Sequence, residues 1–175
     1  MKRPNDVVEA DLIAFLSIVQ KYNVDYLPIM WQHALPKLGQ GGNAMICQST
    51  FITDMPLAFK RFHVSEASGQ DYLPLISEVL ILKQPLIESH PNIVDLEGVC
   101  WEVKPDTERA HPVLVFEKAS WDLHQFMKVH DGMSMSIRER LKICAEIGSA
   151  IMVLHACGLL FPQVFTFETL TWTQT

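Results

Sequence analysis

The first regular pattern of apolar positions lies near the N-terminus, between residues 7 and 22. Apolar residues recur there every three or four positions, which is the spacing of one helix face. They are Val8, Leu12, Phe15, Leu16 and Val19. Acidic Asp6, Glu9 and Asp11 occupy the expected first turn, where the helix dipole stabilises negative charge. The pattern therefore predicts an amphipathic helix over residues 7–22.

Short apolar runs separated by polar or glycine-rich stretches dominate the middle of the chain, and such runs are typical of strands. The predicted strands lie at residues 31–38, 45–47, 56–62, 93–102 and 112–117. The first of them runs into a glycine turn, and a charged loop containing Lys104 separates the last two. Because the first three runs are short and joined by turns, we expect them to form an antiparallel meander.

Two further segments have helical spacing. Residues 75–82 carry apolar side chains at helical intervals and stop near Pro85, which predicts a helix between the strands. A long helix is predicted from Ser136, which is a suitable N-cap because Glu139 follows three residues later. The apolar face expected on this long helix consists of Ile137, Leu141, Cys144, Ile147, Ile151 and Leu154.

Composition narrows the class of protein. The 175 residues are 49% hydrophobic and 19% charged, which indicates one domain, or part of a larger one, with a core of its own. Acidic residues (20) outnumber Lys and Arg (14), and the net charge of −6 argues against nucleic-acid binding, which needs a basic face. The four cysteines lack zinc spacing and are expected to be reduced thiols. With no export signal or membrane-spanning run, we expect a soluble, cytoplasmic protein.

The glycine turn is the first candidate for chemistry. Residues 39–46 fit the pattern G-x-G-x-x-(G)-x-V, with Ala44 in the third glycine position and Ile46 in place of valine. Glycines in such a loop let backbone N–H groups approach phosphates without interference from Cβ atoms. A glycine-rich hairpin turn is the structural alternative. Because the glycines join two strands and no Gly-Lys-Ser/Thr ending follows, a Rossmann loop or a P-loop is disfavoured.

Lys60 is the second candidate. It lies in the apolar run Leu57-Ala58-Phe59-Lys60, close to the V-A-I-K pattern. A lone lysine is usually a solvated edge residue, but a lysine buried on an apolar strand needs a partner of opposite charge. Glu78, eighteen positions later in the predicted helix, can supply it. We therefore expect Lys60 and Glu78 to lie within salt-bridge distance, or to be separated only by an outward swing of the helix over residues 75–82.

The order of the parts that follow makes the pattern more specific. The predicted helix is followed by His90-Pro91-Asn92-Ile93-Val94, and then by an apolar run that ends in Phe116-Glu117. From about residue 35 to about residue 160, this order resembles the N-terminal lobe of a eukaryotic protein kinase and the start of its C-terminal lobe.

The resemblance implies a role for each matched position. The glycine loop would cover the phosphates of ATP, Ile46 and Ala58 would enclose the adenine, and Lys60, paired with Glu78, would hold the α- and β-phosphates. Phe116 would be the gatekeeper, and residues 117–119 the hinge whose backbone bonds the adenine edge. The implied ATP-binding residues are Gly39, Gln40, Gly41, Gly42, Asn43, Ala44, Ile46, Ala58, Lys60, Glu78, Phe116, Glu117 and Ala119.

The sequence departs from the family after the long helix. A working kinase continues with the H-R-D-L-x-x-x-N, D-F-G and A-P-E motifs, which supply the catalytic base, the magnesium ligands and the substrate platform. None of them follows Leu160, so we expect a truncated domain with no catalytic residue and no metal ligand, although the family uses magnesium with ATP. His130-Asp131-Gly132 precedes the helix and is expected to be a turn. The resemblance implies that His155 is a packing histidine.

The sequence thus predicts an α+β fold: a kinase-like five-stranded antiparallel sheet with one helix against it, then a partial helical C-lobe. The expected divisions are an N-terminal helical extension, the N-lobe, the partial C-lobe and a divergent tail, at residues 1–30, 31–119, 120–160 and 161–175.

The expected function is that of the ATP-binding lobe of a phosphotransferase acting on protein Ser/Thr or Tyr, without activity of its own. Two alternatives stay open: a non-catalytic module that binds a protein on the surface facing the C-lobe, and a truncated gene product. The apolar side chains of the tail predict self-association.

Overall fold

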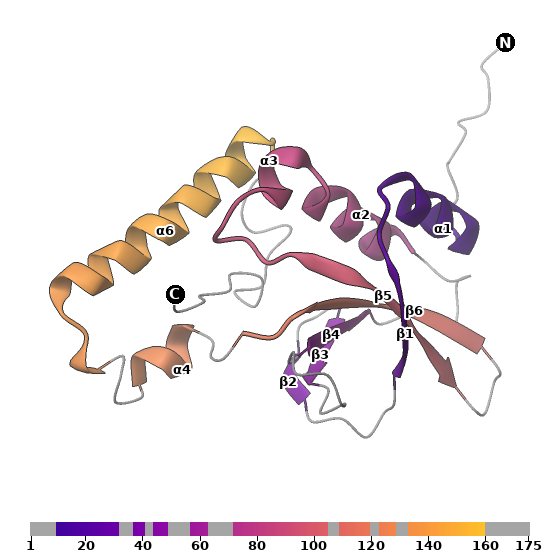
Figure 1. The fold of residues 1–175 in the computed structure, drawn as a ribbon, viewed down its shortest axis with the longest axis horizontal. Helices are drawn as coiled ribbons and strands as arrows, with labels where there is room; N and C mark the ends of the chain where they lie inside the picture. The colour runs from indigo at the N-terminus through magenta and orange to yellow at the C-terminus, as the bar shows by residue number, and fades with distance from the viewer. Residues whose placement is uncertain are drawn as a thin grey trace, which may run out of the picture.

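The fold was analysed in a computed structural model of the chain. It describes residues 10–31, 37–40, 44–48, 57–62, 72–104, 109–119, 123–128 and 133–159. In chain order the elements are α1 (Leu12–Lys21), β1 (Tyr26–Trp31), β2 (Lys37–Gln40), β3 (Ala44–Gln48), β4 (Leu57–Phe62), α2 (Leu73–Leu82), α3 (Pro85–Glu88), β5 (Leu96–Lys104), β6 (Arg109–Glu117), α4 (Leu123–Lys128) and α6 (Ile137–Ala156). Figure 1 shows α1, α2 and α3 in a row over one face of the sheet.

The sheet has the strand order β1-β5-β6-β4-β3-β2 within the described residues. Its five strands from β5 to β2 pair antiparallel, as the sequence predicts. A sixth strand, β1, pairs parallel with β5 at the edge and was not predicted. The α+β fold with a kinase-like sheet is therefore confirmed, with one strand added.

The single strand predicted over residues 31–38 is wrong. Trp31 ends β1 and Lys37 begins β2, and these two strands lie at opposite edges of the sheet. Pro28 lies inside β1 and interrupts the strand pattern in the sequence. An edge strand accommodates it, because one side of such a strand needs no N–H donor.

Helix α1 begins later than its apolar pattern suggests. Asp11 is its N-cap, and the carboxylate accepts a hydrogen bond from the backbone N–H of Ala14 at 2.8 Å. The predicted residues 7–9 lie outside the described part. Phe15 and Val19 of this helix are fully buried, against α2 and the sheet.

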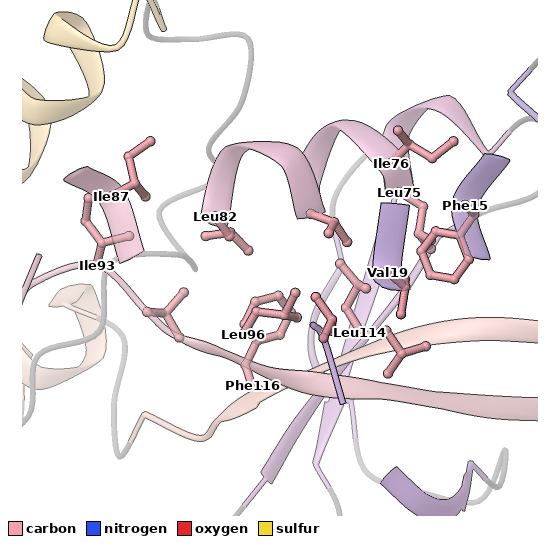
Figure 2. Close-up of a cluster of buried hydrophobic side chains, with 14 of the residues drawn as sticks. Phe15, Val19, Leu75, Ile76, Leu82, Ile87, Ile93, Leu96, Leu114 and Phe116 are labelled. Carbon is pink, nitrogen blue, oxygen red and sulfur yellow. The ribbon is translucent and has the colours of Figure 1, made fainter. Parts of the chain in front are cut away.

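The main core lies between the sheet and the helices α1, α2 and α3. Figure 2 shows Phe15 and Val19 of α1 beside Leu75 of α2, with Leu114 and Phe116 on the sheet beneath them. A smaller cluster covers the other face of the sheet; its buried residues are Cys47, Phe59, Cys100, Val113 and Val115. The sheet therefore buries both faces, and consecutive residues of β4 enter different clusters.

Helix α6 has the predicted N-terminus, and its buried face was predicted in part. Ser136 and Glu139 form the expected capping box. In the second half of the predicted face Leu154 is buried and Ile147 and Ile151 are half-buried, but in the first half Ile137 and Leu141 are 78% and 63% exposed and Cys144 is exposed. The residues that α6 buries are Ile143, Ala150 and Leu154. The first half was wrong because apolar residues occur all around this helix, so periodicity alone could not select the side that meets α3.

The thiol and membrane predictions concern the whole chain. All four cysteines are free: Cys47 and Cys100 are buried, Cys157 is half-buried and Cys144 is exposed. No helix in the described ranges has both the length and the apolar character needed to cross a bilayer.

Candidate functional site

The site is built on the helix-facing side of β4. Side chains alternate along a strand, so Ala58 and Lys60 share one face. The register places Lys60 between Ile46 of β3 and Leu114 of β6, and Ala58 opposite Phe116. Residues directly opposite one another in a sheet point to the same side. Four predicted site residues, from three strands, are thus brought together on one face.

Lys60 and Glu78 form an ion pair across the gap between the sheet and α2. Lys60 Nζ donates to Glu78 Oε1 at 2.6 Å, and their side chains are 11% and 10% exposed. Glu78 lies on the buried side of α2, one residue before the fully buried Val79. The predicted salt-bridge distance is confirmed, and the pair links the strand to the helix.

The pair leaves part of the ammonium group available. An ammonium has three N–H donors, and the bond to Glu78 uses one. Lys60 Nζ also lies 5.4 Å from the centroid of the Phe62 ring, where the negative face of the ring favours a cation. A lysine held in this way has a fixed position and retains donors for an anionic ligand.

Next to the pair the surface is apolar. Ala58 and Ile46 are half-buried, whereas Phe116 is buried and packs beneath α2 with Leu96, as Figure 2 shows. The two half-buried side chains present an apolar surface, and Phe116 lies on the same face of the sheet, opposite Ala58. Such a surface suits a planar ring.

The segment predicted to be the hinge, residues 117–119, lies at the end of β6. Strand β6 ends at Glu117, which pairs with Leu57 at the start of β4. Glu117 is exposed, and Lys118 and Ala119 are half-buried. This segment leads from the sheet towards α4.

The glycine loop is bracketed by β2 and β3, which pair as a hairpin with Gly39 opposite Ile46 and Gln40 opposite Met45. The strand-turn-strand setting that the sequence predicts is therefore confirmed at its flanks. Ala44 begins β3 and is buried. Gly41, Gly42 and Asn43, at the tip, lie outside the described residues.

Two histidine predictions have different outcomes. His155 is exposed in the last turn of α6, so the packing role was wrong; a basic side chain there suits the negative end of the helix dipole. The segment His130-Asp131-Gly132 lies outside the described residues.

The structure also shows polar contacts that sequence reasoning missed. His90 Nε2 lies 3.1 Å from Ser149 Oγ, which joins the His-Pro-Asn turn to α6. Arg61, the residue after Lys60, pairs with Glu102 of β5 at 2.6 Å on the other face of the sheet. Strand alternation could have placed Arg61 on that face, but no local signal in the sequence identifies a partner 41 positions away. In the part of the chain that the structure describes, no group of three or more His, Cys, Asp or Glu side chains could hold a metal ion.

Three known proteins with similar sequences are named as kinases or as a pseudokinase. A probable serine/threonine-protein kinase of Dictyostelium discoideum is 28% identical over 127 residues, which are 71% of this chain and 22% of that protein. A non-functional pseudokinase of Arabidopsis thaliana is 30% identical over 110 residues, 63% of this chain and 26% of that protein. A cyclin-dependent kinase 4 homolog of Caenorhabditis elegans is 22% identical over 124 residues, 70% of this chain and 30% of that protein.

The matched region thus spans only 22% to 30% of the length of these relatives. The family profile described as "Protein tyrosine and serine/threonine kinase" matches residues 33–164, which is more than half of the chain. This range contains the hairpin, the Lys60–Glu78 pair, the predicted hinge and α6. The chain therefore belongs to the protein tyrosine and serine/threonine kinase family.

Proposed function

We propose that this chain binds ATP through the face that carries Lys60 and acts as the nucleotide-binding lobe of a protein-kinase-family member. The observation that carries the proposal is the 2.6 Å pair between Lys60 and Glu78, in a setting with little exposure. Burying two charges is costly unless they are well paired. In this family the same lysine-helix glutamate pair orients the lysine towards phosphates. In this proposal residues 31–119 are the N-lobe, residues 120–160 begin the C-lobe, residues 1–30 are an N-terminal extension and residues 161–175 diverge.

The residues present fit an adenine nucleotide. Lys60 retains N–H donors for phosphate oxygens, and half-buried Ala58 and Ile46 offer apolar contact to the adenine. The backbone of residues 117–119 would bond the adenine edge, and the loop after Gln40 would cover the phosphates. Magnesium, when bound with ATP, would supply positive charge to the phosphates.

We further propose that these 175 residues do not transfer a phosphoryl group by themselves. Transfer needs a group that orients the attacking hydroxyl and side chains that hold the metal, and the family supplies both from motifs that this sequence does not contain. In this proposal those same segments determine whether the whole protein modifies Ser/Thr or Tyr hydroxyls. A cytoplasmic location is supported by the four free thiols, which suit a reducing compartment.

Isothermal titration calorimetry with ATP tests the proposal. Lys60→Met should abolish binding, because it removes the charge that meets the phosphates. Lys83→Met is the matched control: Lys83 also pairs with a glutamate, Glu88, at 2.7 Å, but it lies beyond the C-terminal end of α2, away from the proposed site. Equal affinities for the wild type and Lys60→Met would contradict the proposal.

A second candidate function, protein binding at α6, is favoured by a specific observation. Ile137, Leu141 and Met152 of this helix are each more than 60% exposed. Exposed apolar side chains on one helix indicate a surface that another protein segment or a second copy covers. Sedimentation of the wild type and of Leu141→Ser tests this function: it predicts association that the serine reduces. Lys60→Met should leave that association unchanged.

A further inference from the structure

The segment before the kinase-like sheet makes contacts that the proposed site does not explain. Helix α1 and strand β1 are joined by only four residues, 22–25. Asn23 adopts a left-handed φ of 51°, and the N–H of Val24 donates to the carbonyl of Val19 at 3.0 Å. This is the pattern of a tight helix C-terminal motif. The α1–β1 segment is therefore a unit with a short, hydrogen-bonded connection.

Strand β1 is anchored to β5 where β5 has an irregular register. The N–H of Val99 donates to the carbonyl of Asp25 at 2.8 Å, just before β1 begins. The preceding residue is Gly98, at the register shift of β5. A Cβ atom there would lie 2.6 Å from the Asp25 oxygen and 2.9 Å from Leu27 Cγ. Both distances are below van der Waals contact, and the first involves backbone, so only glycine lets β1 approach this closely.

The other end of the unit holds α2. The N–H of Tyr72, the N-cap residue of α2, donates to the carbonyl of Ala10 at 3.0 Å. The rings of Phe15 and Tyr72 stack with centroids 6.2 Å apart. Phe15 and Val19 are fully buried in the core they share with Leu75 and Val79 of α2, and Figure 2 shows both side chains beside Leu75. Helix α2 carries Glu78, and Glu78 forms the ion pair with Lys60 of the sheet.

We propose that Gly98 and Phe15 are positioning residues, through which the α1–β1 segment holds α2, and with it Glu78, against Lys60. The chain of contacts runs from β5 through Gly98 to β1, then through the tight turn to α1, and through Phe15 to α2. The inference rests on the proposed function for its importance to nucleotide binding, but the geometry it describes exists without a ligand.

The test uses the full chain without nucleotide and measures how fast acetic anhydride acetylates Lys60, relative to the exposed Lys142 of the same molecule. Mass spectrometry reports both rates, well below each variant's melting transition. In Gly98→Ala the relative rate should rise about tenfold, which corresponds to about 1.4 kcal/mol of lost local stability. Amide exchange in α2 should rise with it. Gly148→Ala is the matched control, because a Cβ at Gly148 meets nothing within 4 Å.

A second pair of variants acts at the other end of the unit. Phe15→Ala should accelerate acetylation of Lys60 by a similar factor, Phe15→Leu should restore much of the protection, and Ile13→Ala should change nothing, because Ile13 is 73% exposed on the outer side of α1. If Gly98→Ala does not fold cooperatively, the Phe15 and Ile13 variants alone test the proposal. Amide exchange separates local release from a general loss of stability, because a general loss would raise exchange throughout the chain, whereas release of α2 raises it in α2.

The proposal is overturned if Lys60 is acetylated at the same relative rate in Phe15→Ala as in Ile13→Ala, or in folded Gly98→Ala as in Gly148→Ala. Failure of the nucleotide proposal looks different. In that case ATP affinity is unaffected by Lys60→Met, while the acetylation rates still respond to Gly98 and Phe15.

Discussion

Two consecutive residues of β4, Lys60 and Arg61, carry the same charge and each meets a glutamate at 2.6 Å, but on opposite faces of the sheet. Arg61 pairs with Glu102 of β5, so both partners belong to the sheet itself. Lys60 pairs with Glu78, so its partner belongs to a helix. The first pair breaks only if the sheet breaks, whereas the second depends on where α2 lies.

Exposure separates the two pairs further. The side chain of Glu102 is 1% exposed, against 10% for Glu78. A glutamate sealed inside a sheet has no path to a ligand, while the Lys60–Glu78 pair sits at the edge of an apolar surface that carries Ala58 and Ile46. The comparison teaches that a short, buried ion pair does not by itself indicate a functional site. What distinguishes the Lys60 pair is that it joins two separate elements, a strand of the sheet and the helix α2.

The largest expected effect is a loss of stability when the Arg61–Glu102 pair is broken. Arg61→Met should lower the free energy of unfolding by about 3 kcal/mol, because it removes the guanidinium from a carboxylate that is almost fully buried. Chemical denaturation measures this loss. The double variant Arg61→Met/Glu102→Gln is the control and should be more stable than Arg61→Met, because the buried charge is gone as well. A loss below about 1 kcal/mol would erase the contrast between the pairs.

Breaking the Lys60–Glu78 pair should lower the free energy of unfolding less, but it should affect ATP binding more. Lys60→Met should lower the free energy of unfolding by about 1–2 kcal/mol, because a shift of α2 can return Glu78 to water. The same variant should lose ATP binding, while Arg61→Met should keep it at temperatures where it is folded. The comparison fails if Arg61→Met loses binding and Lys60→Met retains it.

The reactivity of Cys100 reports how well water is excluded from the face of the sheet that carries the Arg61–Glu102 pair. Burial raises the pKa of the Cys100 thiol to about 12, and Cys100 lies two residues before Glu102 in β5. At mildly alkaline pH almost none of it is thiolate, the reactive form. Alkylation followed by mass spectrometry should therefore modify the exposed Cys144 first and Cys100 only on unfolding. Equal rates for the two thiols would show that water enters beside the Arg61–Glu102 pair.

The smallest effect is expected at a fully exposed carboxylate. Hydrogen bonds from the side chain and then the backbone of Ser136 hold the pKa of Glu139 below its usual range. A lowered folded-state pKa contributes stability above the unfolded-state pKa, and this contribution is lost as the pH falls through the folded-state value. Glu139→Ala should thus lower the melting temperature slightly at neutral pH and not in acid. An acid-insensitive loss would mean that the charge has no part in the cap.

Much of the fold follows from periodicity, and the exceptions have physical causes. Strand alternation and helical spacing predict β3, β4, β5, β6 and α2, because each of these segments has a distinct apolar pattern. Strand β1 was missed because Pro28 interrupts its pattern, and only its position at the sheet edge makes the proline acceptable. The buried face of α6 was predicted only in part, because side chains such as Ile143, Ile147 and Met152 give it apolar residues on several sides.

The site was predictable where the order of motifs constrains it. Lys60 and Glu78 are eighteen residues apart; the need of a buried lysine for an opposite charge suggests that they meet, and the family pattern makes the pairing specific. Nothing local predicts that α1 packs on α2, or that Gly98 makes room for β1, because these contacts join segments up to 73 residues apart in the sequence. Contacts of this length depend on tertiary packing rather than on any pattern that one sequence displays.

The most direct test of the central claim, that Lys60 faces the phosphates of ATP, is a chemical one. An acyl phosphate of ATP transfers its acyl group to a lysine amine beside the phosphate chain, forming an amide and releasing the nucleotide. Mass spectrometry of the labelled protein should find the acyl group on Lys60, not on Lys83, and excess ATP should prevent the labelling. Labelling of Lys60 and Lys83 to the same extent, unchanged by excess ATP, would contradict the account.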